Sequence, residues 1–589
     1  MQLNKYMYPT KDIDEVKSLS MPIKKLKSFY TQKMNFSTMK KQLVSAVLAF
    51  GVSISTWAQS TQDGINFIYY EKFNSAAELL KKVVAANPND VNATYWLGQA
   101  YIKQDKIDAA KDLYQKALQG GMNQAMIWVG MGHVELLTGG DKNAARQQFE
   151  QAITSTKGKK GAENPEILNA VGRANADGNS LQGDAVYGSE VLKRAAALDS
   201  KNPDIDINLG LCYLKMGSDF GGQAVEAFTD ATRRNPQYAK AYYRMGRVYQ
   251  AQNNKESMTD QYEKALAADP KFAPAYLAYF LYYQNRDVNE AKRYLDQYVA
   301  NADADCNVDF FVADYLFRSG KNQESIERAK AMETGNCGND PRIKILYAFN
   351  YDRLGDSIKA KENVDQFFAA MPKEKIEPGQ YEFAGKLLAK FPGSEMQAAE
   401  YLYKAMDADS VKENKLQYLA TIAGIYEKSK MYGEQLNTLI KIPAIKGSSS
   451  ASDYFKICSA SRNAKNYTML DSVSKEYISK YPEQTQGYSF NVSAAKGLDV
   501  DTSKGLAIEP INAYNTILMK DLEKNRKTIY NNYYYQLIYF AQYSKQMDKA
   551  ISVTDQMIGL YPDAASEERK FAEDTKAQLM KANNRSGGK

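Results

Sequence analysis

The chain contains few of the side chains that commonly perform catalysis or bind metals. Its 589 residues include one His, four Cys and three Trp. A His-based catalytic triad or zinc site would therefore have to use His133, and no two cysteines have the Cys-x-x-Cys spacing of metal or redox sites. We predict that the chain is not an enzyme and has no catalytic, cofactor-binding or metal-binding residues.

The chain is also low in proline, in long apolar runs and in net charge. The chain has 16 Pro and 36 Gly but 43 Tyr, a balance typical of a helical protein with many half-buried rings. Residues 1–58 hold nine Lys and three acidic residues, so the formal charge of +7 falls to about +1 without them. A chain that is nearly neutral elsewhere lacks a basic footprint, and we expect no nucleic-acid partner.

Residues 39–58 have the layout of a secretory signal peptide. Two lysines follow Met39, residues 43–54 are almost entirely apolar, and Thr56 and Ala58 supply small side chains before a cleavage point. This apolar core is too short to span a bilayer, and no later run approaches 18 apolar residues. We expect export to the periplasm or cell envelope, with no stable membrane span after signal removal. Residues 1–38 precede this complete export start, and we interpret them as a disordered extension or a misassigned start.

A spacing of 34 residues recurs in the remainder of the chain. The clearest copy has Tyr242, Met245, Gly246, Tyr249, Tyr262, Ala265 and Pro270 at positions 4, 7, 8, 11, 24, 27 and 32 of one unit. The same frame fits two further segments, through Leu97, Gly98, Tyr101, Ala110, Tyr114 and Ala117, and through Leu209, Gly210, Tyr213, Ala224, Phe228, Ala231 and Pro236. In these residues the chain resembles the tetratricopeptide repeat family. Among the members of that family, it resembles the exported or periplasmic bacterial proteins.

The repeat spacing has a physical basis. Small residues at positions 8, 20 and 27 let two antiparallel helices approach closely, large ones fill the seam between them, and Pro at position 32 ends the second helix. Each pair leaves an apolar face that a neighbouring pair must cover. We predict an all-α, right-handed superhelical solenoid of about fourteen helix pairs. Residues 59–375 match the repeat well, 376–562 continue it in degenerate form, and 563–589 form a capping helix and a frayed tail.

One candidate binding site is polar. Co-chaperone members of the family hold a carboxylate in a clamp of Lys, Asn and Arg, and the resemblance places Asn208, Lys240 and Arg244 at matching positions. Tyr243 and Arg247 belong to the same candidate set. The match is partial, because Asn169 and Arg173 stand where the family has Lys and Asn.

A second candidate is aromatic. With Pro562 at position 32, Tyr535, Tyr539 and Tyr543 fall at positions 5, 9 and 13, on one face of a first helix, while Tyr534 and Leu537 fall on the seam. An exposed row of rings suits stacking of a peptide or sugar. The alternative is that these rings simply pack on the preceding unit.

Two further observations concern His133 and the cysteines. His133 falls at about position 9 of its unit, where a side chain faces the concave groove and either contacts a ligand or is solvated. Cys306 and Cys337 flank one predicted helix pair at the same end, which in an exported chain suggests a disulfide, with two free thiols as the alternative. Cys212 and Cys458 lie in apolar surroundings and are interpreted as small buried side chains.

These features favour binding over catalysis. The resemblance implies an exported protein–protein interaction scaffold that takes a protein or peptide in the concave groove of its superhelix. An envelope glycan-binding protein that uses aromatic platforms is the alternative. A carboxylate-based glycan-cleaving enzyme is disfavoured, because it requires two carboxylates facing across a cleft, a geometry that the sequence does not supply.

The mature chain is expected to begin at Gln59, because a charged start, a short apolar core and small residues occur together only at 39–58. Intact-mass measurement of exported protein checks this prediction. A mass that still includes residues 39–58 would contradict it.

Overall fold

The computed structural model describes residues 60–335 and 337–586. Within these ranges the chain is entirely helical, and no strand is present. It divides into two compact units, residues 60–346 and 347–586, each considered below by itself. The predicted signal peptide 39–58 and the extension 1–38 lie outside the described residues. Among those described, no helix has the length and apolar character needed to cross a membrane.

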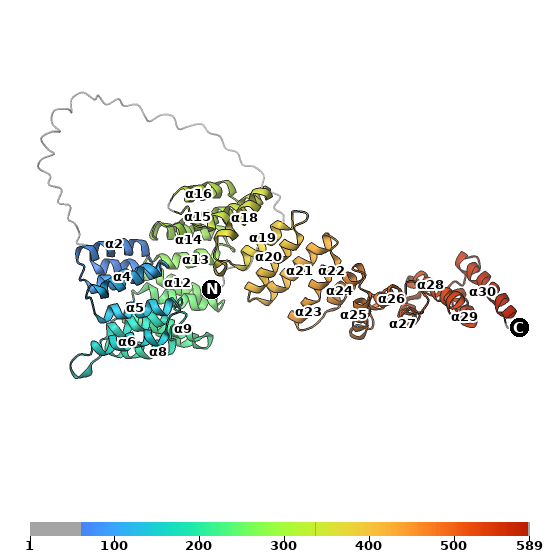
Figure 1. The fold of residues 1–589 in the computed structure, drawn as a ribbon, viewed down its shortest axis with the longest axis horizontal. Coiled ribbons are helices and arrows are strands. Elements are labelled where there is room, and N and C mark those ends of the chain that lie inside the picture. The colour runs from blue at the N-terminus through green and yellow to red at the C-terminus, as the bar shows by residue number, and fades with distance from the viewer. Residues whose placement is uncertain (1–59, 336, 587–589) are drawn as a thin grey trace, which may run out of the picture. The chain divides into compact units, whose positions relative to one another are not determined.

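The first unit is built from consecutive antiparallel helix pairs, α1/α2 through α15/α16 (Figure 1). The helices are α1 Thr61–Tyr69, α2 Phe73–Ala86, α3 Val91–Lys103, α4 Ile107–Gln119, α5 Ala125–Leu137, α6 Lys142–Ser155, α7 Pro165–Ala176, α8 Ala185–Leu198, α9 Pro203–Met216, α10 Gly221–Arg234, α11 Ala239–Ala251, α12 Lys255–Ala268, α13 Ala273–Tyr283, α14 Val288–Asn301, α15 Cys306–Arg318 and α16 Asn322–Thr334.

The second unit continues the pairing, with α17 starting just before the boundary. Its helices are α17 Arg342–Arg353, α18 Ser357–Ala370, α19 Pro378–Leu388, α20 Glu395–Ala408, α21 Lys412–Lys428, α22 Tyr432–Leu439, α23 Lys441–Lys446, α24 Ala451–Asn463, α25 Tyr467–Lys480, α26 Thr485–Leu498, α27 Ile508–Leu518, α28 Leu522–Ile538, α29 Met547–Leu560 and α30 Glu567–Ser586. With α23 and α30 set aside, the described residues form fourteen pairs. The predicted all-α class and stacked pairing are confirmed. The change from well-matched to degenerate repeats at residue 375 stays a prediction.

Helix boundaries follow local sequence. Asn164 and Asn202 cap α7 and α9 with their side chains, and each is followed by a proline at the first helical position, where no N–H is needed. Asp287 and Asp305 cap α14 and α15 in the same way, by accepting hydrogen bonds from backbone N–H groups of the first turn. Short polar side chains therefore define where successive helices begin.

The seam of seven of the fourteen described pairs depends on a glycine in the first helix. A methyl group added to Gly246 would lie 2.4 Å from the ring of Tyr262, so only a residue without Cβ lets the two helices approach this closely. The same arrangement recurs in other pairs: Gly64 with Leu80, Gly98 with Tyr114, Gly132 with Phe149, Gly172 with Leu192, Gly210 with Phe228, and Gly385 with Leu402. The predicted roles of positions 8 and 24 are confirmed at these pairs.

The first unit closes on itself. The backbone N–H groups of Asn74 and Ser75, at the start of α2, donate to Asp303 Oδ2 at 2.9 and 3.2 Å, and Ser75 Oγ donates to Oδ1 at 2.5 Å. A carboxylate suits this place because unpaired N–H groups and the helix dipole favour negative charge. The α14–α15 turn thereby holds the first helix pair.

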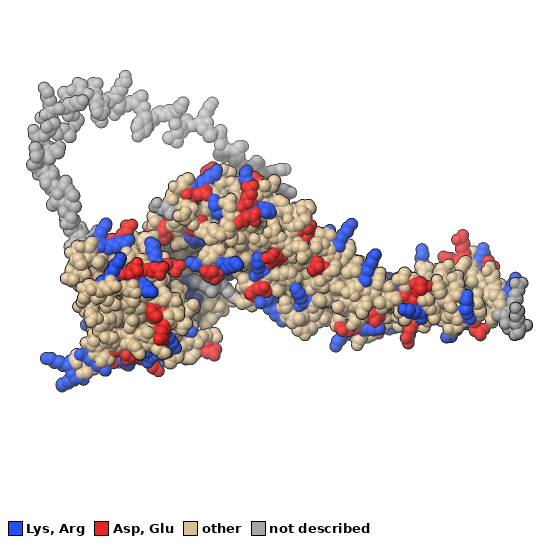
Figure 2. Space-filling view, viewed as in Figure 1, with Lys and Arg blue, Asp and Glu red and all other residues tan. Residues whose placement is uncertain are grey.

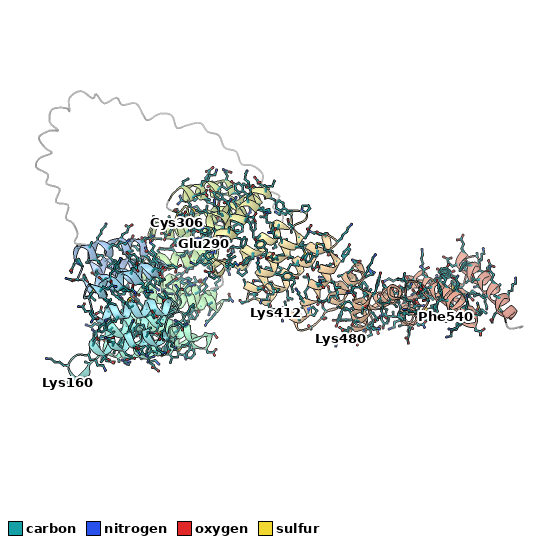
Figure 3. The ribbon with its side chains drawn as sticks, viewed as in Figure 1. Lys160, Glu290, Cys306, Lys412, Lys480 and Phe540 are labelled. Carbon is teal, nitrogen blue, oxygen red and sulfur yellow. A yellow bond between two sulfur atoms is a disulfide. The ribbon has the colours of Figure 1, made fainter. Side chains whose placement is uncertain are left out.

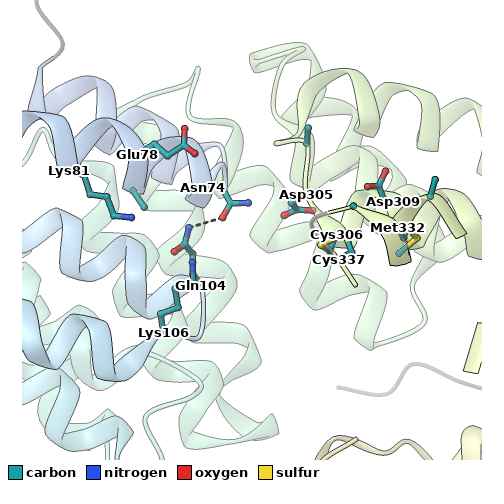
Figure 4. A pocket seen from close by; sticks show the side chains of 14 residues that line it. Asn74, Glu78, Lys81, Gln104, Lys106, Asp305, Cys306, Asp309, Met332 and Cys337 are labelled. Carbon is teal, nitrogen blue, oxygen red and sulfur yellow. Dashed lines mark hydrogen bonds between the residues drawn. A yellow bond between two sulfur atoms is a disulfide. The ribbon is translucent and has the colours of Figure 1, made fainter. Parts of the chain in front are cut away.

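Cys306 and Cys337 form a disulfide beside this closure (Figures 3 and 4). Their Cα atoms are 5.5 Å apart, and the bond joins the start of α15 to the segment after α16. Cys212 and Cys458 are free and buried. Burial raises the pKa of each of these two thiols to about 12, which makes them poor nucleophiles in the folded chain.

We expect exported protein to contain the Cys306–Cys337 bond in oxidised form, and a non-reducing peptide map should show the cross-linked pair. Closing a loop of 31 residues stabilises the fold by about 3–4 kcal/mol in the chain-entropy model, so reduction should lower the melting temperature. Cys212 and Cys458 provide the internal control, since they should be alkylated only after unfolding. Alkylation of Cys306 and Cys337 in unreduced, folded protein would contradict the prediction.

Candidate functional site

The polar candidate residues lie on the first helices of two successive pairs. Asn208 is on α9, and Lys240, Tyr243, Arg244 and Arg247 are on α11. Asn208 is buried and its Nδ2 donates to Asn169 Oδ1 at 2.8 Å. Asn208 and Asn169, which stand at two of the positions compared with the carboxylate clamp, therefore bond to each other.

Lys240 is bound by a carboxylate of the chain itself. Its Nζ lies 3.4 Å from Asp204 Oδ1, which also accepts a hydrogen bond of 2.6 Å from the Tyr238 hydroxyl. Burial acts to raise the pKa of Asp204, but the nearby Lys240 and Arg173 outweigh it and lower the pKa. Asp204 thus occupies the place that a ligand carboxylate would take.

The last residue of α1, Tyr69, and the turn after it cover the rest of this candidate site. The Tyr69 ring centroid lies 5.2 Å from that of Tyr238 and 5.3 Å from that of Phe272, and Glu71 Oε1 lies 4.0 Å from an Arg244 nitrogen. Arg247 meanwhile donates to the Tyr243 hydroxyl at 3.1 Å. The first helix pair therefore packs against the inner positions of α11, and the polar candidate set stabilises the closed first unit.

A cavity of about 640 Å³ lies where the first unit closes (Figure 4). Gln104 Nε2 donates to Asn74 Oδ1 at 2.7 Å at its edge. Carboxylates and lysines both line its wall, and two of the carboxylates are engaged: Asp305 caps α15, and Asp309 pairs with Arg328. The wall of the cavity therefore has charges of both signs, and two of its carboxylates are already engaged within the chain.

His133 differs from the expected groove residue. Its side chain is 1% exposed, and its Nε2 lies 3.4 Å from Asp177 Oδ2, which also binds Lys103 Nζ at 2.8 Å. Asp177 caps the end of α7 at the start of the insertion that ends at Gly183, so this insertion begins with the carboxylate that lies beside the histidine. Burial lowers the pKa of His133, although the nearby Asp177 carboxylate opposes that effect.

The tyrosine candidates do not form a continuous exposed row. Helix α28 ends at Ile538, and Tyr539–Tyr543 form a single π-helical turn, which changes the side-chain directions after Tyr535. Tyr535 is half-buried against Lys496, Tyr539 packs over Gly505, and Tyr543 is exposed. Tyr534 is 43% exposed rather than on the seam, because the buried ring is that of the adjacent Tyr533.

Sequence reasoning missed a set of residues on α24 and α26. Phe455 is 46% exposed and its ring contacts Phe490, while the Arg462 guanidinium lies over Phe490. Lys496 lies over the Tyr535 ring. A usable signal was present, because Arg462 and Lys496 are 34 residues apart and so occupy the same repeat position.

His133 should make stability depend on pH. The pKa of His133 is lowered in the folded chain, so the unfolded chain binds the proton more readily. The contribution to folding stability that is present above about pH 6.5 is therefore lost as pH falls below that value, by at most about 1.4 kcal/mol per pH unit. We expect the melting temperature of wild type to fall more than that of His133→Gln when the pH is lowered from 7.5 to 5.5. Asp206, whose pKa burial raises to about 6, has the opposite pH dependence but is common to both proteins and cancels. Equal losses would contradict the prediction.

Comparisons with known proteins agree with the repeat assignment. Tetratricopeptide repeat models match residues 68–128 and 239–272. No curated relative matches the chain.

Several solved structures resemble parts of the chain at low identity. The C-terminal part of a TPR repeat-containing protein from Cytophaga hutchinsonii is 20% identical, covers 45% of this chain and 98% of its own, and has a TM-score of 0.28. A tetratricopeptide repeat protein from Parabacteroides merdae is 16% identical and covers 51% and 97%, with a TM-score of 0.27. Yeast Tom70 is 13% identical and covers 66% and 94%, with a TM-score of 0.34. Tetratricopeptide repeat models thus match two segments of the chain, and the described residues form fourteen helix pairs in which both segments lie.

Proposed function

We propose that the chain is an exported, non-catalytic scaffold that binds a segment of another protein on the inner face formed by the first helices of its pairs. The observation that carries this proposal is the pairing of successive helices within each unit, from α1 to α16 in the first and from α19 to α29 in the second. Each pair buries its seam internally and leaves one face of its first helix as a surface, so stacked pairs provide a long, rigid site that needs little reordering on binding. Export rests on the signal-peptide layout of residues 39–58.

The binding region is assigned to the second unit, residues 347–586. In the first unit, Asp204 and the turn of Tyr69 and Glu71 already occupy the inner positions around Lys240 and Arg244. In the second unit, first helices keep exposed rings such as Phe455 on α24 and Tyr534 on α28. Figure 2 shows Lys and Arg interspersed with Asp and Glu on the visible face, which favours a site with local rather than overall charge selection.

Affinity capture from envelope extract with the chain starting at Gln59 tests this function. We expect a protein to be retained, and we expect retention to disappear when the extract is first digested with protease. The same extract after periodate oxidation of its glycans serves as the control and should still yield the partner. Retention that survives protease but is lost after periodate would contradict the proposal and identify a glycan-binding protein.

A further inference from the structure

Two basic side chains occupy equivalent positions on neighbouring first helices of the second unit. Arg462 is near the end of α24 and Lys496 near the end of α26, and the two helices pack against each other. Because packed helices lie about 8–10 Å apart, the two side chains start roughly one helix spacing from each other. Together with Phe455, Phe490 and Tyr535, they make up what we call the Phe455 face.

Both cations of the Phe455 face rest on aromatic rings. The Arg462 guanidinium lies 5.2 Å from the Phe490 ring centroid, and Lys496 Nζ lies 4.3 Å from that of Tyr535. Neither side chain forms an ion pair within 4.0 Å with any carboxylate in residues 60–335 or 337–586. The rings hold the two cations in place, and the positive charges of the cations remain available to an anion from a partner.

The absence of a carboxylate partner is costly for Lys496 in particular. Its side chain is half-buried, and burial lowers its pKa with no acidic residue opposing the effect. Most lysines of the second unit that approach a carboxylate do so at the surface, as Lys475 does with Asp471. An anion bound beside Lys496 would restore the charge balance that the chain itself does not provide.

An exposed ring adjoins these cations. Phe455 is 46% exposed, and its centroid lies 5.4 Å from that of Phe490, the ring on which Arg462 rests. Large apolar side chains that remain exposed beside unpaired charges are typical of the centre of protein-binding surfaces.

We propose that the Phe455 face binds an acidic peptide segment of a partner protein, with carboxylates on Arg462 and Lys496 and an apolar side chain against Phe455. This inference rests on the proposed scaffold function and specifies the chemistry of its partner. One helix spacing corresponds to about three residues of a peptide in the polyproline II conformation, at about 3.1 Å per residue. Every third side chain of that conformation lies on one face, so acidic residues at every third position fit best. A neutral glycan would stack on Phe455 but would leave both cations unpaired.

The test uses a defined probe, the capped peptide acetyl-Glu-Phe-Ser-Glu-Phe-Ser-Glu-amide, titrated against the chain starting at Gln59. We expect the peptide to bind, and we expect its glutamine counterpart to bind at least about tenfold more weakly, since the difference is two lost charge contacts. Arg462→Gln with Lys496→Gln should weaken the acidic peptide to the same extent and flatten its salt dependence. Phe455→Ala should weaken both peptides.

Matched controls lie on the same unit. Lys480→Gln removes an exposed cation at the end of α25 (Figure 3), and Phe571→Ala removes a ring on α30 that is 45% exposed, nearly the same as Phe455. Neither should change the affinity of the acidic peptide. Circular dichroism confirms that each variant retains its helicity.

Several outcomes would overturn the inference. These are no binding of the acidic peptide to wild type, equal affinity for the glutamine peptide, or equal affinity of the Arg462 and Lys496 double variant. Maltohexaose binding that depends on Phe455 but not on the cations would identify a sugar platform instead. If the protein captured from envelope extract binds all variants equally, the scaffold function stands while the Phe455 face is excluded as its site.

Discussion

The structure depends on one close contact, between the backbone of a glycine in the first helix of a pair and a large side chain from the second. At Gly246 the ring of Tyr262 occupies the space that a Cβ would need. Any larger residue there would separate the helices, because a close-packed seam has no free volume to accept it. The contact sets the distance within a pair, and each pair in turn provides the surface on which the next one stacks. A local substitution of this glycine would thus disturb the neighbours as well.

This contact explains how far the sequence predicts the fold. Pairs with a glycine at position 8 and a large residue at position 24 were recognised from spacing alone, but later pairs exchange the two sizes. Cys458 and Ile538 stand at position 8, and the fully buried Ser474 and Thr554 stand at position 24. The hydroxyls of these two residues bond to backbone carbonyls of their own helix, which satisfies their polarity in a buried seam. The seam is filled in both arrangements, but a search for one pattern detects only the first.

The candidate sites were less predictable than the fold, for a different reason. Register predicted that Lys240, Tyr243 and Arg247 share one first helix, and all three lie on α11, but register alone does not indicate how tightly the stack curves. The Tyr69 and Glu71 turn, about 170 residues earlier in the chain, occupies those positions only because the first unit closes. The insertion after α7 begins with Asp177, which lies beside the buried His133. The π-helical turn after α28 changes the directions of the Tyr539 and Tyr543 side chains. Insertions and helix irregularities change side-chain environments without changing the repeat spacing.

The closure of the first unit also determines the order in which it can fold. Asn74 must wait for Asp303, which follows 229 residues later, whereas each helix pair needs only its own hairpin and the next one. During synthesis the early pairs can therefore form and stack locally, while the rings of Tyr69 and Tyr70 stay uncovered until α11 and α13 have been made. The first pair is thus exposed the longest of any in this unit, and a chain released early would present two unpaired tyrosines and an empty helix N-terminus to any other chain nearby.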